Sequence, residues 1–167
     1  MSHPTAAGAI LAAWNSTTSY IASGHVAIFS GRSKEGLVFR RLRQSLEELA
    51  PGIEVELGVP FDGWEIDLVA SSEAERVAVE GKFKLRSDGA VPDNRKAAFF
   101  DLYKLERYIG SARYSRRLFV WLTEHDAYIR RATGDSADFS THRGRVYEPG
   151  TPLRAKRSRN PMRCRLF

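Results

Sequence analysis

Apolar residues recur at helical spacing in the stretch that ends at Pro51-Gly52. They lie three or four residues apart, at Phe39, Leu42, Leu46 and Leu49. This spacing predicts a helix that Ser33 caps and that Pro51-Gly52 ends. Glu35 lies four residues before Phe39, so its carboxylate is expected on the apolar stripe of this helix. A charge at such a position is costly unless another group pairs with it.

Three segments with strand patterns follow, at residues 53–59, 64–70 and 76–85. In the first segment the apolar residues alternate, and one face is expected to carry Ile53, Val55, Leu57 and Val59. In the second, Ile66 and Leu68 are expected on one face and Asp67 on the other. In the third, Glu80 and Lys82 are expected side by side on one face.

The later pattern completes an α/β order. A polar loop at 86–95 leads into a helix predicted over 96–109, which Gly110 ends. The continuously apolar run at 117–123 predicts a central strand covered on both faces, and residues 126–131 are expected to add a short edge element. The order helix, three strands, helix, strand predicts an α/β sandwich, with helices flanking a central mixed sheet.

The ends of the chain differ from this middle part. Residues 1–30 form an N-terminal extension, and its short apolar run is open to three interpretations: a helix packed on the domain, a dimer contact or a loose leader. Residues 31–150 are expected to form the domain, and residues 151–167 a basic tail. No signal peptide or membrane span is convincing, so we expect a protein of the reducing cytoplasm with no membrane partner.

Composition adds one strong asymmetry. The chain has 167 residues, 43% of them hydrophobic, which is enough for a sizeable core. The tail holds six of the 26 Lys and Arg and no acidic residue, so residues 1–150 are neutral overall and the tail carries the net charge of +6. The tail includes Arg154, Lys156, Arg157 and Arg159. Such a tail is typical of a nucleic-acid contact, and a solvated end is the alternative interpretation.

Missing residues and motifs exclude several enzyme classes. The single cysteine, Cys164, excludes an intrachain disulfide framework and a cysteine-based zinc cluster. The sequence contains no HExxH, GxSxG, phosphate-binding loop or GxGxxG motif, which leaves no basis for a zinc enzyme, serine hydrolase, nucleoside triphosphatase or dinucleotide enzyme.

Acidic residues and a lysine fall on adjacent predicted strands. If these strands pair, Asp67, Glu80 and Lys82 converge at one place on the sheet, and Glu35 can reach it from the first helix. Carboxylate oxygens are the ligands that Mg²⁺ prefers, and a bound metal polarises a phosphoryl oxygen. A lysine beside it offsets charge in the transition state. This set predicts metal-assisted phosphodiester hydrolysis, whereas a structural network of ion pairs is the competing interpretation.

These residues resemble the PD-(D/E)XK phosphodiesterase superfamily, whose members have the restriction-endonuclease-like fold. The resemblance rests on Asp67 in WEIDLVA, Glu80-Gly81-Lys82 in VAVEGKF, the upstream Glu35 and the αβββαβ order, over residues 33–123. One departure is Ile66, which stands where the family has its name-giving proline.

The resemblance implies roles for these residues. Asp67, Glu80 and the main-chain carbonyl of Gly81 would bind Mg²⁺, for which Mn²⁺ would substitute. Glu35 would supply an outer carboxylate, and Lys82 would position or activate water. On the following helix, Lys104 is the first choice as an auxiliary residue, ahead of Asp101 and Tyr103.

The resemblance also implies a magnesium-dependent DNA endonuclease. A chain of this size has little room for a recognition domain, so sequence-specific cleavage would need a homodimer or a partner subunit, and structure-specific cleavage is equally open. Two alternatives remain: a non-catalytic nucleic-acid-binding or assembly module with the same fold, and an RNA nuclease.

Overall fold

The computed structural model describes residues 5–25, 34–109, 113–133 and 137, and the backbone of two short strands at 152–154 and 163–165. Helix α1 (Ala6–Tyr20) begins at Thr5, whose hydroxyl accepts a hydrogen bond from the Gly8 N–H, and a single π-helical turn, η1 (Ile21–His25), follows it. Helix α2 (Lys34–Leu49) confirms the predicted helix. Its predicted cap, Ser33, lies outside the described residues.

The N-terminal extension contributes to the core. Ile10 and Ala13 of α1 are fully buried and pack with Leu42 and Leu46 of α2, while the side chain of Leu49, predicted on the same stripe, is exposed. Of the three interpretations of residues 1–30, this packing supports a helix docked on the domain.

The four-stranded sheet is mixed and has the order β1-β2-β3-β4. Strand β2 (Trp64–Ser71) pairs in antiparallel fashion with both β1 (Glu54–Phe61) and β3 (Arg76–Lys84). Asp62 and Gly63, both at positive φ, form the two-residue turn between β1 and β2. Strand β4 (Arg116–Thr123) lies parallel to β3, and α3 (Val91–Ile109) connects the two. This α/β architecture with a mixed sheet is the class that the sequence predicts.

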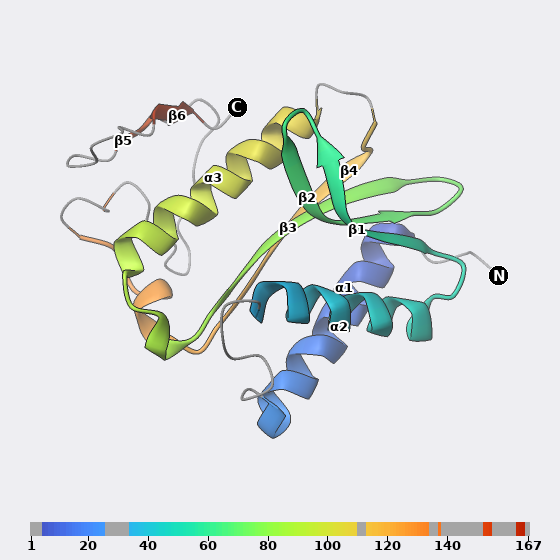
Figure 1. Ribbon diagram of the computed structural model, residues 1–167, viewed down its shortest axis with the longest axis horizontal. Coiled ribbons are helices and arrows are strands. Elements are labelled where there is room, and N and C mark those ends of the chain that lie inside the picture. The colour runs from blue at the N-terminus through green and yellow to red at the C-terminus, as the bar shows by residue number, and fades with distance from the viewer. Residues whose placement is uncertain are drawn as a thin grey trace.

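Helices cover both faces of the sheet (Figure 1). Helices α1 and α2 lie on one face, over a core that includes Leu68 and Val79. Helix α3 lies across the other face, where Leu105 packs with Ile66 and Ala78. Two small strands, β5 (Pro152–Arg154) and β6 (Arg163–Arg165), pair with each other.

The predicted alternation of faces is wrong at one point. Ile66 packs in the core beneath α3, whereas Leu68 packs beneath α1 and α2. The paired strand β1 changes face at the same place. Leu57 packs against the core beneath α1 and α2, whereas Val59 packs against the core beneath α3. The physical reason is Gly58, which has a positive φ of +63°. At this position the regular strand pairing is interrupted, and no pair forms between Gly58 and the residue opposite, Asp67.

Three other predictions, about where elements begin, where they lie or what they are, are also wrong. Helix α3 begins at Val91 rather than near residue 96, since Pro92 fits the first turn, where its missing N–H costs nothing. Strand β4 ends the strand order instead of lying at its centre, although Leu118 and Phe119 do pack against opposite faces, as its apolar run predicts. Residues 126–131, predicted to add a short edge element to the sheet, instead contain a 3-10 turn, η4 (Asp126–Tyr128).

Among the residues that the structure describes, no helix combines the length and the apolar character needed to cross a membrane. Most of residues 134–151 lie outside the described part, as do the side chains of the basic tail, including Arg154, Lys156, Arg157 and Arg159.

Candidate functional site

The site lies along one edge of β3. Strand β2 pairs with β3 only as far as Leu68 opposite Val79, whereas β3 continues beside β4 to Lys84. In the described part of the chain, no strand pairs with β3 on the β2 side beyond Val79. We call the β2-facing side of residues 80–85 the free edge of β3. Its backbone N–H groups need other acceptors.

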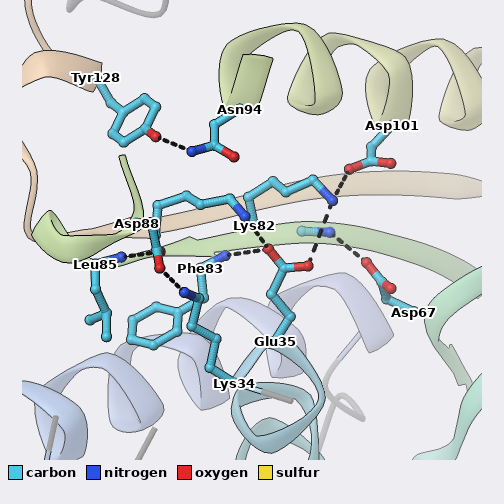
Figure 2. Close-up of polar contacts among 12 residues, drawn as sticks. Lys34, Glu35, Asp67, Lys82, Phe83, Leu85, Asp88, Asn94, Asp101 and Tyr128 are labelled. Carbon is cyan, nitrogen blue, oxygen red and sulfur yellow. Dashed lines mark hydrogen bonds and ion pairs between the residues drawn. The ribbon is translucent and has the colours of Figure 1, made fainter. Parts of the chain in front are cut away.

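Three carboxylates supply those acceptors (Figure 2). The N–H of Gly81 donates to Asp67 Oδ2 at 2.9 Å, that of Phe83 to Glu35 Oε1 at 3.4 Å, and that of Leu85 to Asp88 Oδ2 at 2.7 Å. Every second residue of the free edge is thus hydrogen-bonded to an acidic side chain.

Local structure places each of these carboxylates. Asp67 is the residue opposite Gly58, so it lies at the kink where the two strands change face. Glu35 lies in the first turn of α2, where a negative charge is also favoured by the helix dipole. Asp88 ends a short 3-10 turn, η3 (Arg86–Asp88), directly after β3, and it forms an ion pair with Lys34.

The α3-facing side chains of β3 pair with α3. Glu80 is only 1% exposed, and its Oε2 accepts a hydrogen bond from Lys104 Nζ at 2.8 Å. Lys82 Nζ lies 2.6 Å from Asp101 Oδ2, and Lys104 Nζ also lies 3.3 Å from Asp101 Oδ1. Asp101 and Lys104 are three residues apart, so they share the face of α3 that covers β3.

Glu35 extends this pairing to α2. Its carboxylate lies 3.7 Å from Lys82 Nζ and 3.1 Å from Lys84 Nζ. Figure 2 shows Glu35 between α2 and Lys82. Six side chains therefore form a continuous series of alternating charge, which we call the charge chain. In order, they are Glu80, Lys104, Asp101, Lys82, Glu35 and Lys84.

Asp67 lies beside the charge chain and differs from its members. Burial raises the pKa of Asp67, and this effect outweighs the Gly81 N–H and the lysines Lys104 and Lys82, which lower it; Asp101 adds to the rise. Burial works to lower the pKa of Lys82, but Asp101 and the other carboxylates raise it above its usual value. Lys82 is therefore a cation at neutral pH, whereas the charged form of Asp67 is disfavoured by its burial.

Gly81 is required by packing. A Cβ at this position would lie 2.7 Å from Val120 Cγ2, 2.8 Å from the Val120 carbonyl oxygen and 3.0 Å from Phe39 Cζ. The close approach of β3, β4 and α2 between Glu80 and Lys82 therefore leaves no room for a side chain.

Hydrogen bonds fix the position of the first turns of α3 and thereby orient the helix face that carries Asp101. The Asn94 amide donates to the Gly89 carbonyl at 2.9 Å and to the Tyr128 hydroxyl at 2.8 Å, which ties α3 to η4 (Figure 2). The buried Arg95 donates to the Arg130 carbonyl at 2.9 Å.

The structure places the predicted residues close to one another around β3. Asp67 accepts from the Gly81 N–H at the free edge, Lys82 contacts Glu35, and Glu80, on the α3-facing side, contacts Lys104 directly. Sequence reasoning ranked Asp101 too low and missed Lys84 and Asp88. For Asp101, the signal was its i, i+3 spacing to Lys104 on an amphipathic helix.

The predicted metal ligands are not gathered into a dense cluster. Within the described ranges, no group of three or more His, Cys, Asp and Glu side chains is arranged to hold a metal ion. Comparison of the chain with protein-family models, with curated proteins and with solved structures gave no match.

Proposed function

We propose that this protein is a metal-dependent nuclease with a restriction-endonuclease-like core that hydrolyses phosphodiester bonds in DNA. The observation that carries the proposal is that Asp67, Glu80 and Lys82, with Glu35, lie around the same stretch of β3: Asp67 and Glu35 at its free edge, and Glu80 and Lys82 paired with α3. The element order α2, β1, β2, β3, α3, β4 agrees with it.

The donors present fit Mg²⁺ or Mn²⁺. Mg²⁺ usually takes one or two protein carboxylates and keeps several waters, so two ligands on adjacent strands, Asp67 and Glu80, are sufficient. The raised pKa of the buried Asp67 carboxylate marks a charge that a divalent cation would compensate. The main-chain carbonyl of Gly81 and, farther out, Glu35 would complete the site. The bound ion would polarise a phosphoryl oxygen and acidify water.

The side chains of the chain itself have separate tasks in this mechanism. Lys82 is cationic, so it orients the attacking water and offsets phosphate charge and does not accept a proton. Asp101, at 2.6 Å, holds the Lys82 ammonium in place. Four carboxylates (Asp67, Glu80, Asp101 and Glu35) outnumber the three lysines Lys82, Lys84 and Lys104. The bound ion would offset the remaining repulsion of a phosphodiester, so cleavage would require it. The basic tail, a second subunit or both would hold the DNA.

A specific observation favours a second candidate, the non-catalytic nucleic-acid-binding module. Glu80, Lys82 and Glu35 each have an oppositely charged partner within the protein, as in a structural network of ion pairs. Such a module would bind nucleic acid in a salt-dependent manner that needs no metal.

Cleavage assays separate the two candidates. Supercoiled plasmid, linear duplex, branched DNA, single strands and RNA would be incubated with EDTA, Mg²⁺ or Mn²⁺. The test variants are Asp67→Asn and Lys82→Met, and the matched controls are Asp93→Asn and Lys96→Met, which remove an ion pair on the first turns of α3, away from β3.

We expect metal-dependent cleavage of DNA that falls by about two orders of magnitude or more in both test variants and persists in both controls. Preferential cleavage of RNA would reassign the substrate. Folded wild-type protein that binds DNA equally well in EDTA and in Mg²⁺, and cuts no substrate, would establish the binding module instead.

A further inference from the structure

The charge chain gives Glu80 a counter-ion before any metal is present. Glu80 is 1% exposed, and an uncompensated carboxylate at such a depth is costly. Lys104 meets that cost through its hydrogen bond of 2.8 Å to Glu80 Oε2. The ammonium therefore occupies the surroundings of a carboxylate that the proposed metal site needs.

A divalent cation and this ammonium exclude one another electrostatically. Both are attracted by Glu80, and two cations within about 4 Å of each other repel strongly in a partly desolvated site. Lys104 has a second acceptor, since its Nζ also lies 3.3 Å from Asp101 Oδ1. It can therefore leave Glu80 without becoming an unpaired buried charge.

We infer that Lys104 is a resident counter-ion of Glu80 that the catalytic metal displaces onto Asp101. This inference rests on the proposed metal site. Asp101 also forms an ion pair with Lys82, so a closer contact between Lys104 and Asp101 weakens the ion pair of Asp101 with Lys82. Metal binding at one end of the charge chain thus frees the lysine that acts on water and phosphate. Lys104 sets the metal affinity of the site and couples metal binding to Lys82.

The test measures metal affinity directly and needs no cleavage. Mn²⁺ binding to the full chain would be followed by the electron paramagnetic resonance signal of free Mn²⁺, at low salt and without DNA. Lys104→Met removes the competing charge. Lys104→Gln removes the charge but keeps a hydrogen-bond donor for Glu80. Lys96→Met is the control, a lysine on the same helix whose partner is the exposed Asp93.

We expect both Lys104 variants to bind Mn²⁺ at least about tenfold more tightly than the wild type, because the like-charge repulsion is gone. The affinity of Lys96→Met should equal that of the wild type. Since the variants lose a buried ion pair, thermal unfolding would be recorded with and without Mn²⁺. A variant that folds only with Mn²⁺ also supports the inference, because the metal then replaces the missing counter-ion.

Other results overturn the inference. If the wild type binds Mn²⁺ and the Lys104 variants bind it equally well or more weakly, Lys104 does not compete, and the nuclease proposal stands without it. A Lys104 variant that stays unfolded in saturating Mn²⁺ shows that the metal cannot replace the ammonium. If neither the wild type nor any variant binds Mn²⁺, both the inference and the proposed metal site fail.

Discussion

Replacing Gly81 by alanine would place a methyl group where β3, β4 and α2 meet. The new Cβ would lie 2.7 Å from a Val120 methyl group and 2.8 Å from the Val120 carbonyl oxygen. The methyl group can rotate away, but the carbonyl belongs to the strand that pairs with β3. The two strands must therefore move apart at the residue between Glu80 and Lys82.

The expected cost follows from these contacts. Overpacking of a well-packed core costs about 1–3 kcal/mol, and contact with backbone places this substitution near the upper end. In a chain of this length, each kcal/mol lowers the melting temperature by about 2–4 °C, so Gly81→Ala should lower it by roughly 5–10 °C.

Gly36→Ala provides a matched control. Gly36 lies in α2, and a Cβ there would meet no atom within 4 Å. Alanine is the better helix former by about 0.5–1 kcal/mol, so this variant should melt at a higher temperature than the wild type.

Urea unfolding, followed by tryptophan fluorescence, and calorimetry would measure both variants. A Gly81→Ala protein as stable as the wild type would show that β3 and β4 do accommodate a side chain at this position. Equal shifts for the two glycine variants would show the same, since only Gly81 lacks space for a Cβ.

Four further predictions concern charge. Burial raises the pKa of Asp67, so ionised Asp67 destabilises the folded state at neutral pH, and this penalty disappears as the pH falls through the raised pKa. Asp67→Asn should therefore stabilise the metal-free protein by about 1 kcal/mol at pH 7 but not in acid, as urea unfolding would show. Although burial opposes it, Lys34 and the Leu85 N–H hold the pKa of Asp88 below its usual value, so its stabilisation is present above about pH 4 and is lost as the pH falls through the lowered pKa. Asp88→Asn should therefore cost about 1 kcal/mol at pH 7 and progressively less as the solution is made more acidic. EDTA should abolish cleavage and added Mn²⁺ should restore it, and cleavage that survives chelation would contradict the metal site. Deletion of residues 154–167 removes six basic residues, so it should weaken DNA binding and reduce the slope of log affinity against log salt by up to about five, whereas an unchanged slope would exclude the tail from binding.

Local patterns predicted the elements, because each has its own periodicity. The spacing of Phe39, Leu42 and Leu46 was sufficient for α2, and the alternation around Glu80 and Lys82 was sufficient for β3. These two elements carry four of the candidate residues, Glu35, Glu80, Gly81 and Lys82, which explains why these residues lie close together.

Errors occurred where tertiary structure overrides periodicity. A strict period of two cannot foresee that Gly58 takes positive φ and turns Asp67 toward the N–H of Gly81. The roles of Asp101 and Asp88 depend on how α3 and the turn after β3 fold back onto the strand. Spacing along the chain does not contain that information.

The three acidic side chains along β3 have a consequence for the handling of variants. An uncovered strand edge is a template onto which another extended chain can add, and this is a common start of aggregation. Asp67, Glu35 and Asp88 occupy the donors that such a chain would use, and they place negative charge in its path. Asp67 and Glu35, which we propose for chemistry, thus protect the strand edge together with Asp88. Alanine at these positions would leave the strand edge with unpaired N–H groups and prone to aggregation. Inactive controls should therefore carry Asn or Gln, which still accept the backbone hydrogen bonds.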